Sequence, residues 1–183
     1  MDKFSVMNDF HDLLRQHSEA DFVCQGNYEL PVLQGTVATT YKTAALLLAA
    51  AATPRRAKIY EIEFGQTGSL NSTDVQCQWD LSRFSATAVL TATAVVPNLL
   101  DLADAACNTL GFNNNTAELT YTTAGAGLAL KNWAINQRGS YRWRALDNGD
   151  NIIMPATSNS GVGLRVLSSG FTSSAVGNVS FVE

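Results

Sequence analysis

The stretch of sequence that decides the fold runs over residues 136–167 and reads NQRGSYRWRALDNGDNIIMPATSNSGVGLRVL. It contains an aromatic, arginine-rich segment, a turn cluster at residues 147–150, a short apolar run closed by a proline, and a second alternating run. Such runs, separated by tight polar connections, are typical of consecutive β-strands. The Asn-Gly pair of the first turn supplies positive φ angles at low cost. The stretch therefore predicts strands over residues 140–146, 152–155 and 161–167.

Similar alternation recurs elsewhere in the chain and predicts further strands. These strands are expected over residues 58–64, 75–79, 85–96, 117–123, 128–135 and 175–182. Residues 97–109 change to helical spacing, with Asn98 as a candidate N-cap, and predict one short helix. Roughly eight to ten strands at regular spacing with a single short helix indicate a mainly β chain that folds as a jelly-roll-like antiparallel β-sandwich.

The segment over residues 36–64 carries conflicting signals. Residues 43–52 are rich in alanine and leucine, which favour a helix, but they are short and follow a β-branched run. Residues 58–64 alternate with the period of a half-buried strand. We therefore expect a hairpin whose second arm is residues 58–64, and both helix and strand stay open for residues 44–52.

Residues 1–35 differ in character from the rest of the chain. Residues 1–30 contain six acids and two bases, so the net charge of −4 belongs to this segment. An apolar residue every three to four positions over residues 1–17 predicts an amphipathic helix, which needs a surface to pack against. We expect an N-terminal helical or extended arm over residues 1–35 and a β-sandwich domain over residues 36–183. The candidate partner-binding residues of the arm, which docks either on its own domain or on a neighbouring subunit, are Phe4, Met7, Phe10, Leu13 and Leu14.

The chain lacks the motifs of common catalytic and metal sites. The two histidines, His11 and His17, lie in the N-terminal segment without a matching nucleophile and orienting group. The loop at residues 147–150 lacks the calcium-binding sequence of an EF-hand and is expected to be a turn. The three cysteines show no zinc spacing and are expected to be free thiols: Cys24, Cys77 and Cys107. We therefore expect no enzyme, no cofactor and no metal.

Charge and hydropathy argue against two classes of partner. The sequence has no basic stripe, which argues against nucleic acid, and its most apolar run is far shorter than the roughly 20 residues that span a bilayer. Charged residues are only 15% of the chain, and such a neutral polar surface suits contact with other proteins. Arg142 and Arg144 share one face of a predicted strand, where they are expected to form ion pairs or stack on aromatic rings at an interface.

Several segments between Ala57 and Glu183 carry a resemblance to a known group of proteins. They are AKIYEIEFGQTG, QCQWDLSRFSAT, LLDLADAAC, NQRGSYRW and IIMPATSNSGVGLRV, followed by a last strand that ends in Glu183. In this order they resemble small β-sandwich proteins from tailed-bacteriophage structural genes, which look like capsid decoration or cement proteins. The resemblance covers about two-thirds of the chain.

The resemblance implies a virion structural protein that binds and stabilises the outside of a phage capsid. Its partner would be the major capsid protein, with the chain as a homo-oligomer, a dimer or a trimer. It would be made in the host cytoplasm and located on the capsid exterior. The alternative is a receptor- or glycan-binding module of a phage tail or fibre, in which Trp133 and Trp143 would contact a sugar.

Overall fold

A computed structural model of the chain describes residues 26–50, 56–69, 71–85, 91–121, 129–147, 149–155, 157–168 and 170–183. These residues form twelve β-strands and no helix. The strands are β1 (Asn27–Val37), β2 (Lys42–Leu48), β3 (Lys58–Thr67), β4 (Gln76–Ser85), β5 (Thr93–Val95), β6 (Asn98–Leu99), β7 (Leu110–Asn113), β8 (Lys131–Asn136), β9 (Ser140–Arg144), β10 (Ile152–Ile153), β11 (Ser160–Ser168) and β12 (Ser173–Val182). In the part of the chain that the structure describes, no helix is long and apolar enough to span a bilayer.

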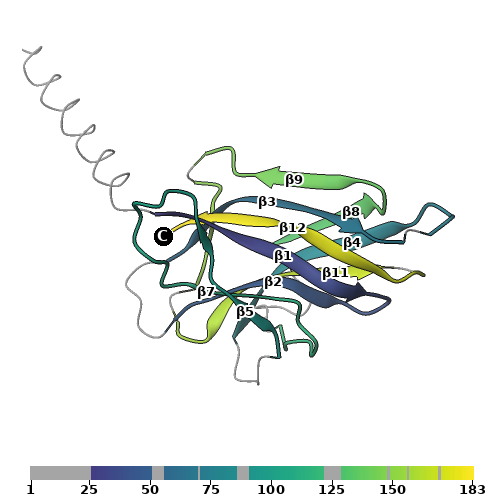
Figure 1. The fold of residues 1–183 in the computed structure, drawn as a ribbon, viewed down its shortest axis with the longest axis horizontal. Coiled ribbons are helices and arrows are strands. Elements are labelled where there is room, and N and C mark those ends of the chain that lie inside the picture. The colour runs from purple at the N-terminus through teal and green to yellow at the C-terminus, as the bar shows by residue number, and fades with distance from the viewer. Residues whose placement is uncertain are drawn as a thin grey trace, which may run out of the picture.

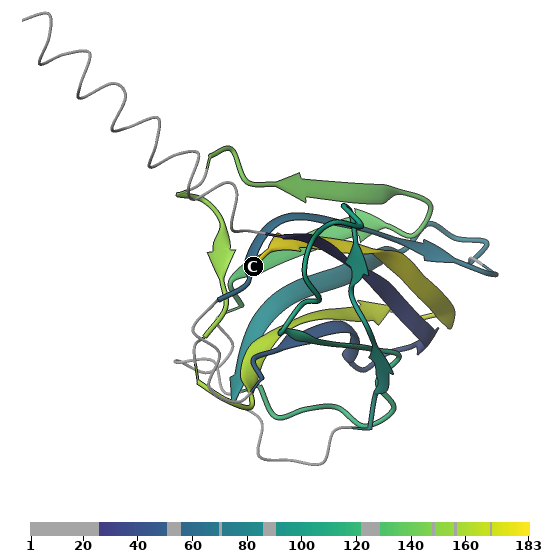
Figure 2. The same cartoon turned by 60° about the vertical axis from the view of Figure 1, so that its left-hand side comes forward.

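The strands form two antiparallel sheets that make a β-sandwich-like arrangement (Figures 1 and 2). The first sheet has the order β10-β3-β12-β1-β6, with β9 also paired to β3. The second sheet has the order β5-β7-β2-β11-β4-β8. The expected mainly β class is therefore confirmed, and strands lie at residues 140–144 and 160–168, where the sequence predicted them over residues 140–146 and 161–167.

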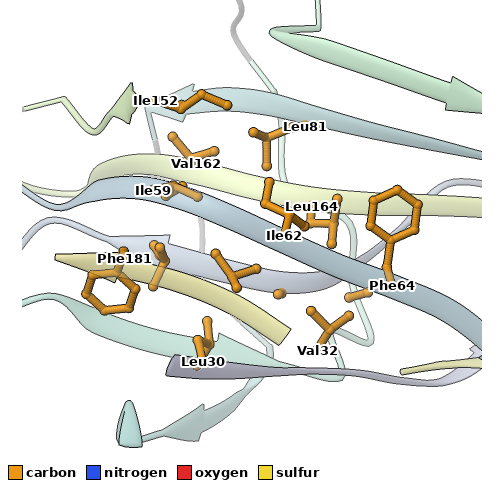
Figure 3. Packing of buried hydrophobic residues seen from close by; sticks show 14 of the residues in the cluster. Leu30, Val32, Ile59, Ile62, Phe64, Leu81, Ile152, Val162, Leu164 and Phe181 are labelled. Atoms are coloured by element: carbon orange, nitrogen blue, oxygen red, sulfur yellow. The ribbon is translucent and has the colours of Figure 1, made fainter. Parts of the chain in front are cut away.

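The core lies between the two sheets because alternate residues of the central strands are apolar and face inward (Figure 3). From the first sheet, Leu30, Ile62 and Phe181 are at most 1% exposed. From the second sheet, Leu81 and Leu164 are each 1% exposed. Burial of such side chains stabilises the fold by roughly 25 cal/mol per Å² of apolar surface removed from water.

The sandwich begins earlier than the sequence predicted. Residues 27–35, assigned above to the N-terminal arm, form most of β1, which pairs along its length with β12. Leu30 and Val32 of this strand are buried in the core, and Pro31 between them is on the opposite face. The expected boundary at residue 35 is therefore too late for the described residues, and residues 1–25 lie outside them.

The hairpin predicted over residues 36–64 is wrong. Residues 42–48 form the strand β2. Residues 44–48, for which the sequence left both helix and strand open, are therefore a strand. However, β2 pairs with β7 and β11 in the second sheet, whereas β3 pairs with β9, β10 and β12 in the first. The two segments are neighbours in sequence but lie in different layers, because each finds its partners far along the chain.

The short helix predicted over residues 97–109 is also wrong. Residues 98–99 form β6 beside β1, and residues 100–109 form a loop in which Leu100 and Leu102 are 54% and 91% exposed. The side chain of Asp101 accepts a hydrogen bond from the backbone N–H of Ala103, which favours a turn over a helix. The loop is held to β1 because Asp104 accepts from the backbone N–H of Asn27 at 3.0 Å.

A strap of residues 114–121 crosses the outer face of the second sheet where a strand had been predicted over residues 117–123. The described part of that segment is not a strand. Leu119 packs with Leu46 and Phe84 in a small second cluster outside the main core. Residues 122–128 and 86–90 lie outside the described residues, so the expected strand at residues 85–96 is described only at its ends.

Candidate functional site

The candidate site is the β8–β9 edge, which we define as residues 131–144. Its two strands are consecutive in sequence but belong to different sheets: β8 pairs with β4, and β9 pairs with β3. In both ribbon views β9 lies on the outside of the molecule (Figures 1 and 2). The edge therefore joins the two layers of the sandwich along one side.

The turn between the two strands is fixed by a fully buried glutamine. The side-chain oxygen of Gln137 accepts from the backbone N–H of Asn71 at 2.9 Å, and its amide group donates to the carbonyls of Asn71 and Thr73 at 3.1 and 2.8 Å. Beside it, Arg138 forms an exposed ion pair with Asp74 at 3.1 Å. A buried amide with three partners holds a turn in one geometry because each unmade bond would leave a polar group unsatisfied.

Aromatic rings fill the inner side of the edge. Trp133 on β8 and Tyr141 on β9 lie 5.1 and 5.8 Å from Phe64, and 6.0 Å from each other, between ring centroids. Phe64 in turn contacts Trp79 at 4.4 Å, and both of these rings are at most 1% exposed. Phe64 and Trp79 thus belong to the core, whereas Tyr141 is 39% exposed.

The rim of this aromatic cluster is partly open. Trp133 and Trp143 are half-buried residues that pack against the core. The ammonium group of Lys131 lies 5.4 Å from the centroid of the Trp143 ring, within the range of a cation–π interaction. The edge therefore offers a surface that is apolar at its centre and charged around it.

The charges of the edge are all positive. Residues 131–144 contain one lysine, three arginines and no acid. Arg142 and Arg144 lie on the outer face of β9, as the sequence predicted, and share one carboxylate, since their guanidinium nitrogens lie 2.7 and 3.8 Å from Glu61. The hydrogen bond to Glu61 raises the pKa of Arg142. Glu63 lies opposite Arg142 on the same face, so the two arginines of β9 face two glutamates of β3.

The backbone of β9 has one open side. It pairs with β3 over five residues from Ser140 to Arg144, and no other described strand pairs with it. An edge strand of this kind presents free N–H and C=O groups to an incoming chain. This arrangement can accept an added strand, with aromatic side chains on one face of β9 and arginines on the other.

The remaining candidate residues fall into two groups. Five of them, together with His11, His17 and Cys24, lie outside the described residues: Phe4, Met7, Phe10, Leu13 and Leu14. The second group is the loop at residues 147–150, where one Asp147 side-chain oxygen accepts from the backbone N–H groups of Gly149 and Asp150 at 2.7 and 3.2 Å. This is the turn that the sequence predicted. Among the described residues, no three acidic, cysteine or histidine side chains gather as ligands for a metal ion.

Sequence reasoning missed a polar network under the strap. Arg165 on β11 forms two hydrogen bonds with Asp80 on β4, and Thr43 on β2 is bonded both to Glu118 and to the hydroxyl of Tyr121. The sequence did contain a signal for this network. Each of the two weakly charged strands, 76–85 and 160–168, has one charged residue of the pair at a position that faces away from the core, Asp80 in the first and Arg165 in the second. These residues fix the strap on the sheet, which makes the network structural.

The chain was compared with protein-family models, curated proteins and solved structures, and no match was found.

Proposed function

We propose that this chain is a non-enzymatic structural protein of a virion that binds and stabilises the outside of a tailed-phage capsid as a homo-oligomer. The proposal rests on the resemblance of its segments to phage decoration proteins and on one structural observation. That observation is the β8–β9 edge, which combines a strand with one open side among the described residues, partly exposed rings and exposed arginines. The jelly-roll-like topology and the major capsid protein as partner belong to the same proposal.

Highly exposed aliphatic side chains support a function in binding other proteins. Leu102 and Leu146 are 91% and 94% exposed, and Val96 is 82% exposed. Covering such groups on a partner is favourable by roughly 25 cal/mol per Å² of apolar surface. On a capsid lattice, many such contacts would act together, so the overall binding would be strong even where the affinity of each single contact is weak.

Binding to purified phage heads tests this function. Full-length protein is mixed with heads that lack it, the heads are sedimented, and the bound copies are counted. The variant Arg142→Gln/Arg144→Gln should lower occupancy at least tenfold, whereas the matched control Arg56→Gln/Arg83→Gln should not. Electron microscopy of decorated heads would give the position and copy number. Failure of the full-length protein to bind heads at micromolar concentration would overturn the proposal.

Deletion of residues 1–17 tests the part that the N-terminal arm plays in this binding. We expect the deletion to lower head occupancy, because the apolar face predicted there needs a surface to cover it. Unchanged occupancy would remove the arm from the proposal and leave the edge in it.

A second candidate is a receptor- or glycan-binding module of a phage tail or fibre. The half-buried Trp133 and Trp143, with Tyr141 39% exposed, favour it because sugar rings stack on exposed aromatic faces. A glycan array probed with the full-length protein and with Trp143→Ala separates the two functions. Binding to defined glycans that Trp143→Ala abolishes would favour this candidate, and a silent array would count against it.

A further inference from the structure

We infer that two copies of this chain form a two-fold dimer through β8, each β8 strand adding antiparallel to the other, so that the second sheets of the two copies join. The inference rests on the proposed function, of which it specifies the homo-oligomer contact. The observations that carry it all come from the described residues of β8 and its neighbours.

Among the described strands, β8 is the edge with the least protection against pairing. The edge strands β5, β6 and β10 have only three, two and two residues, and β9 carries Arg142 and Arg144. By contrast, β8 has six residues, one charge at Lys131, no proline and a regular register with β4. Native proteins protect free edge strands with charge, proline, bulges or shortness. The features of β8 are therefore those of an edge that pairs.

The open side of β8 presents the backbone groups of three exposed residues: Asn132, Ala134 and Asn136. Gln137 donates its backbone N–H to the carbonyl of Val75 at 3.0 Å, one step beyond the last pair of the β4–β8 register. Because backbone direction alternates along a strand, the odd-numbered residues of β8 face β4, and the even-numbered ones direct their N–H and C=O groups away from it. No other described strand pairs with them.

A two-fold axis at Ala134 gives this edge a self-complementary register. Ala134 then lies opposite Ala134 of the second copy, and Asn132 lies opposite its Asn136, so the outward N–H and C=O groups meet in hydrogen-bonded pairs. The carbonyl of Asn136 accepts from the N–H of Gly139 at 2.9 Å and has a second lone pair for the added strand. The side-chain amides of Asn132 and Asn136 also become neighbours, and each can donate and accept.

The same register covers apolar surface on the inner face of β8. Trp133 and Ile135 are half-buried and pack against the core of their own copy. In the two-fold pairing, Trp133 of each copy lies opposite Ile135 of the other. Aromatic and β-branched residues that are neighbours across strands stabilise a sheet, and the pairing removes more of their apolar surface from water.

Like charges do not face each other in this register. Lys131 lies opposite the uncharged Gln137 of the second copy. The next residue along, Arg138, is already paired with Asp74 at 3.1 Å. A two-fold pairing of two β9 strands about their middle residue would instead place Arg142 of one copy opposite Arg142 of the other, which is unfavourable. Charge therefore favours β8 over β9 as the contact between copies.

Sedimentation velocity of the full-length protein without phage heads tests the contact, so its outcome is separate from that of head binding. Ala134→Lys places like charges on the two-fold axis and should weaken dimerisation by about tenfold, and Ala134→Glu should do the same. An equimolar mixture of the two variants should recover the affinity to within about threefold, because opposite charges then meet. The matched control Ala94→Lys changes an exposed alanine of β5, at the opposite edge of the same sheet, and should leave the affinity unchanged.

A proline at the same position tests the backbone pairing itself. Ala134→Pro removes an N–H that points to the open side and leaves the hydrogen bonds to β4 in place, because an edge strand tolerates proline in this orientation. We expect a monomer whose circular dichroism spectrum matches that of the natural chain. A dimer of unchanged affinity would overturn the inference.

A disulfide locates the contact. Opposite Cα atoms in a hydrogen-bonded pair lie about 5.5 Å apart, within the range that a disulfide spans. Ala134→Cys should therefore form a covalent dimer under mild oxidation, seen by mass spectrometry as a link between two copies of residue 134, whereas Ala94→Cys should not. A natural chain that is monomeric at every concentration, or a mixture of the Lys and Glu variants that does not associate, would overturn the inference. A dimer with this link that fails to bind heads would support the contact and overturn the proposed function alone.

Discussion

The guanidinium group of Arg165 donates two hydrogen bonds to the carboxylate of Asp80, at nitrogen–oxygen distances of 2.7 and 2.6 Å. The Arg165 side chain is 20% exposed and that of Asp80 only 4%. The rings of Tyr41 and Tyr121 cover the guanidinium, with centroids 4.7 and 4.3 Å from its carbon. The pair joins β4 to β11 and carries the strap on its outer side.

Removing one member of the pair formed by Asp80 and Arg165 should lower the stability of the protein. Arg165→Met leaves the carboxylate of Asp80 buried without its partner, and we expect a loss of about 3 kcal/mol in the free energy of unfolding, measured with urea. The double variant Asp80→Leu/Arg165→Met should recover more than half of that loss, because no unpaired charge remains. The exposed pair provides the control, since Asp74→Ala should cost less than about 1 kcal/mol. A double variant as unstable as the single one would contradict this account.

Stability should depend on pH through Glu118. Burial raises the pKa of its carboxyl group above the ordinary value of 4.5, although hydrogen bonds from Thr43 lower it in part. Because the pKa in the folded state is higher than in the unfolded state, the contribution to stability is complete below pH 4.5. It is lost as the pH rises through the folded-state pKa. Glu118→Gln should therefore gain stability relative to the natural chain between pH 4 and pH 7.

The hydrogen bonds around Glu118 allow this substitution. Thr43 donates its hydroxyl proton to one carboxylate oxygen at 2.7 Å, so Tyr121 donates to Thr43. A glutamine amide would donate to Thr43, which would then donate to Tyr121. Urea unfolding of both proteins at several pH values measures the effect, and a stability difference that does not change with pH would show that Glu118 is not its source.

The strap depends on a glycine in β11. A Cβ atom at Gly163 would overlap the hydroxyl of Tyr121 and lie 3.0 Å from the ring carbons next to it. Gly163→Ala should therefore displace the strap and lower the free energy of unfolding by about 1–3 kcal/mol, the usual cost of overpacking. Gly139→Ala is the control because its Cβ would meet only a carbonyl oxygen at 3.5 Å. Thermal unfolding measures both, and equal melting temperatures would contradict the close contact.

The thiol of Cys107 should react slowly with alkylating reagents. Burial raises its pKa, and the nearby carboxylate of Glu183 raises it further, since the thiol donates to that carboxylate at 2.9 Å. Glu183→Gln removes the negative charge and should speed alkylation by iodoacetamide at pH 8 several-fold. Mass spectrometry after timed labelling gives the rate, with the buried Cys77 as an internal reference. No acceleration at Cys107 would mean that burial alone protects it.

Local sequence signals were reliable where neighbours in sequence also determine the structure. The turn at residues 147–150 and the strand at residues 140–144 follow from asparagine, glycine and alternating aromatic residues. The shared face of Arg142 and Arg144 follows from the period of a strand alone. These features were predicted because no distant segment has to be known to obtain them.

The predictions failed where contacts between segments far apart in sequence determine the structure. The loop at residues 100–109 has helical spacing, yet Asn108 and Thr109 donate their backbone N–H groups to Glu183, more than 70 residues away. Most of β1 was assigned to the N-terminal arm, because the pairing with β12 that makes it a strand joins residues about 140 positions apart. Similarly, the ion pair between Asp80 and Arg165 depends on a strand register that no local pattern specifies.

The central position of β12 also has a consequence for synthesis on the ribosome. β12 inserts between β1 and β3, so the first sheet lacks its middle until residues 173–182 have emerged. Until then, β1 and β3 have no strand between them, and the backbone edges that β12 later occupies are open to pairing with other nascent chains. The first sheet therefore cannot be completed until β12 has left the ribosome, and chaperone occupancy should be highest just before this strand appears.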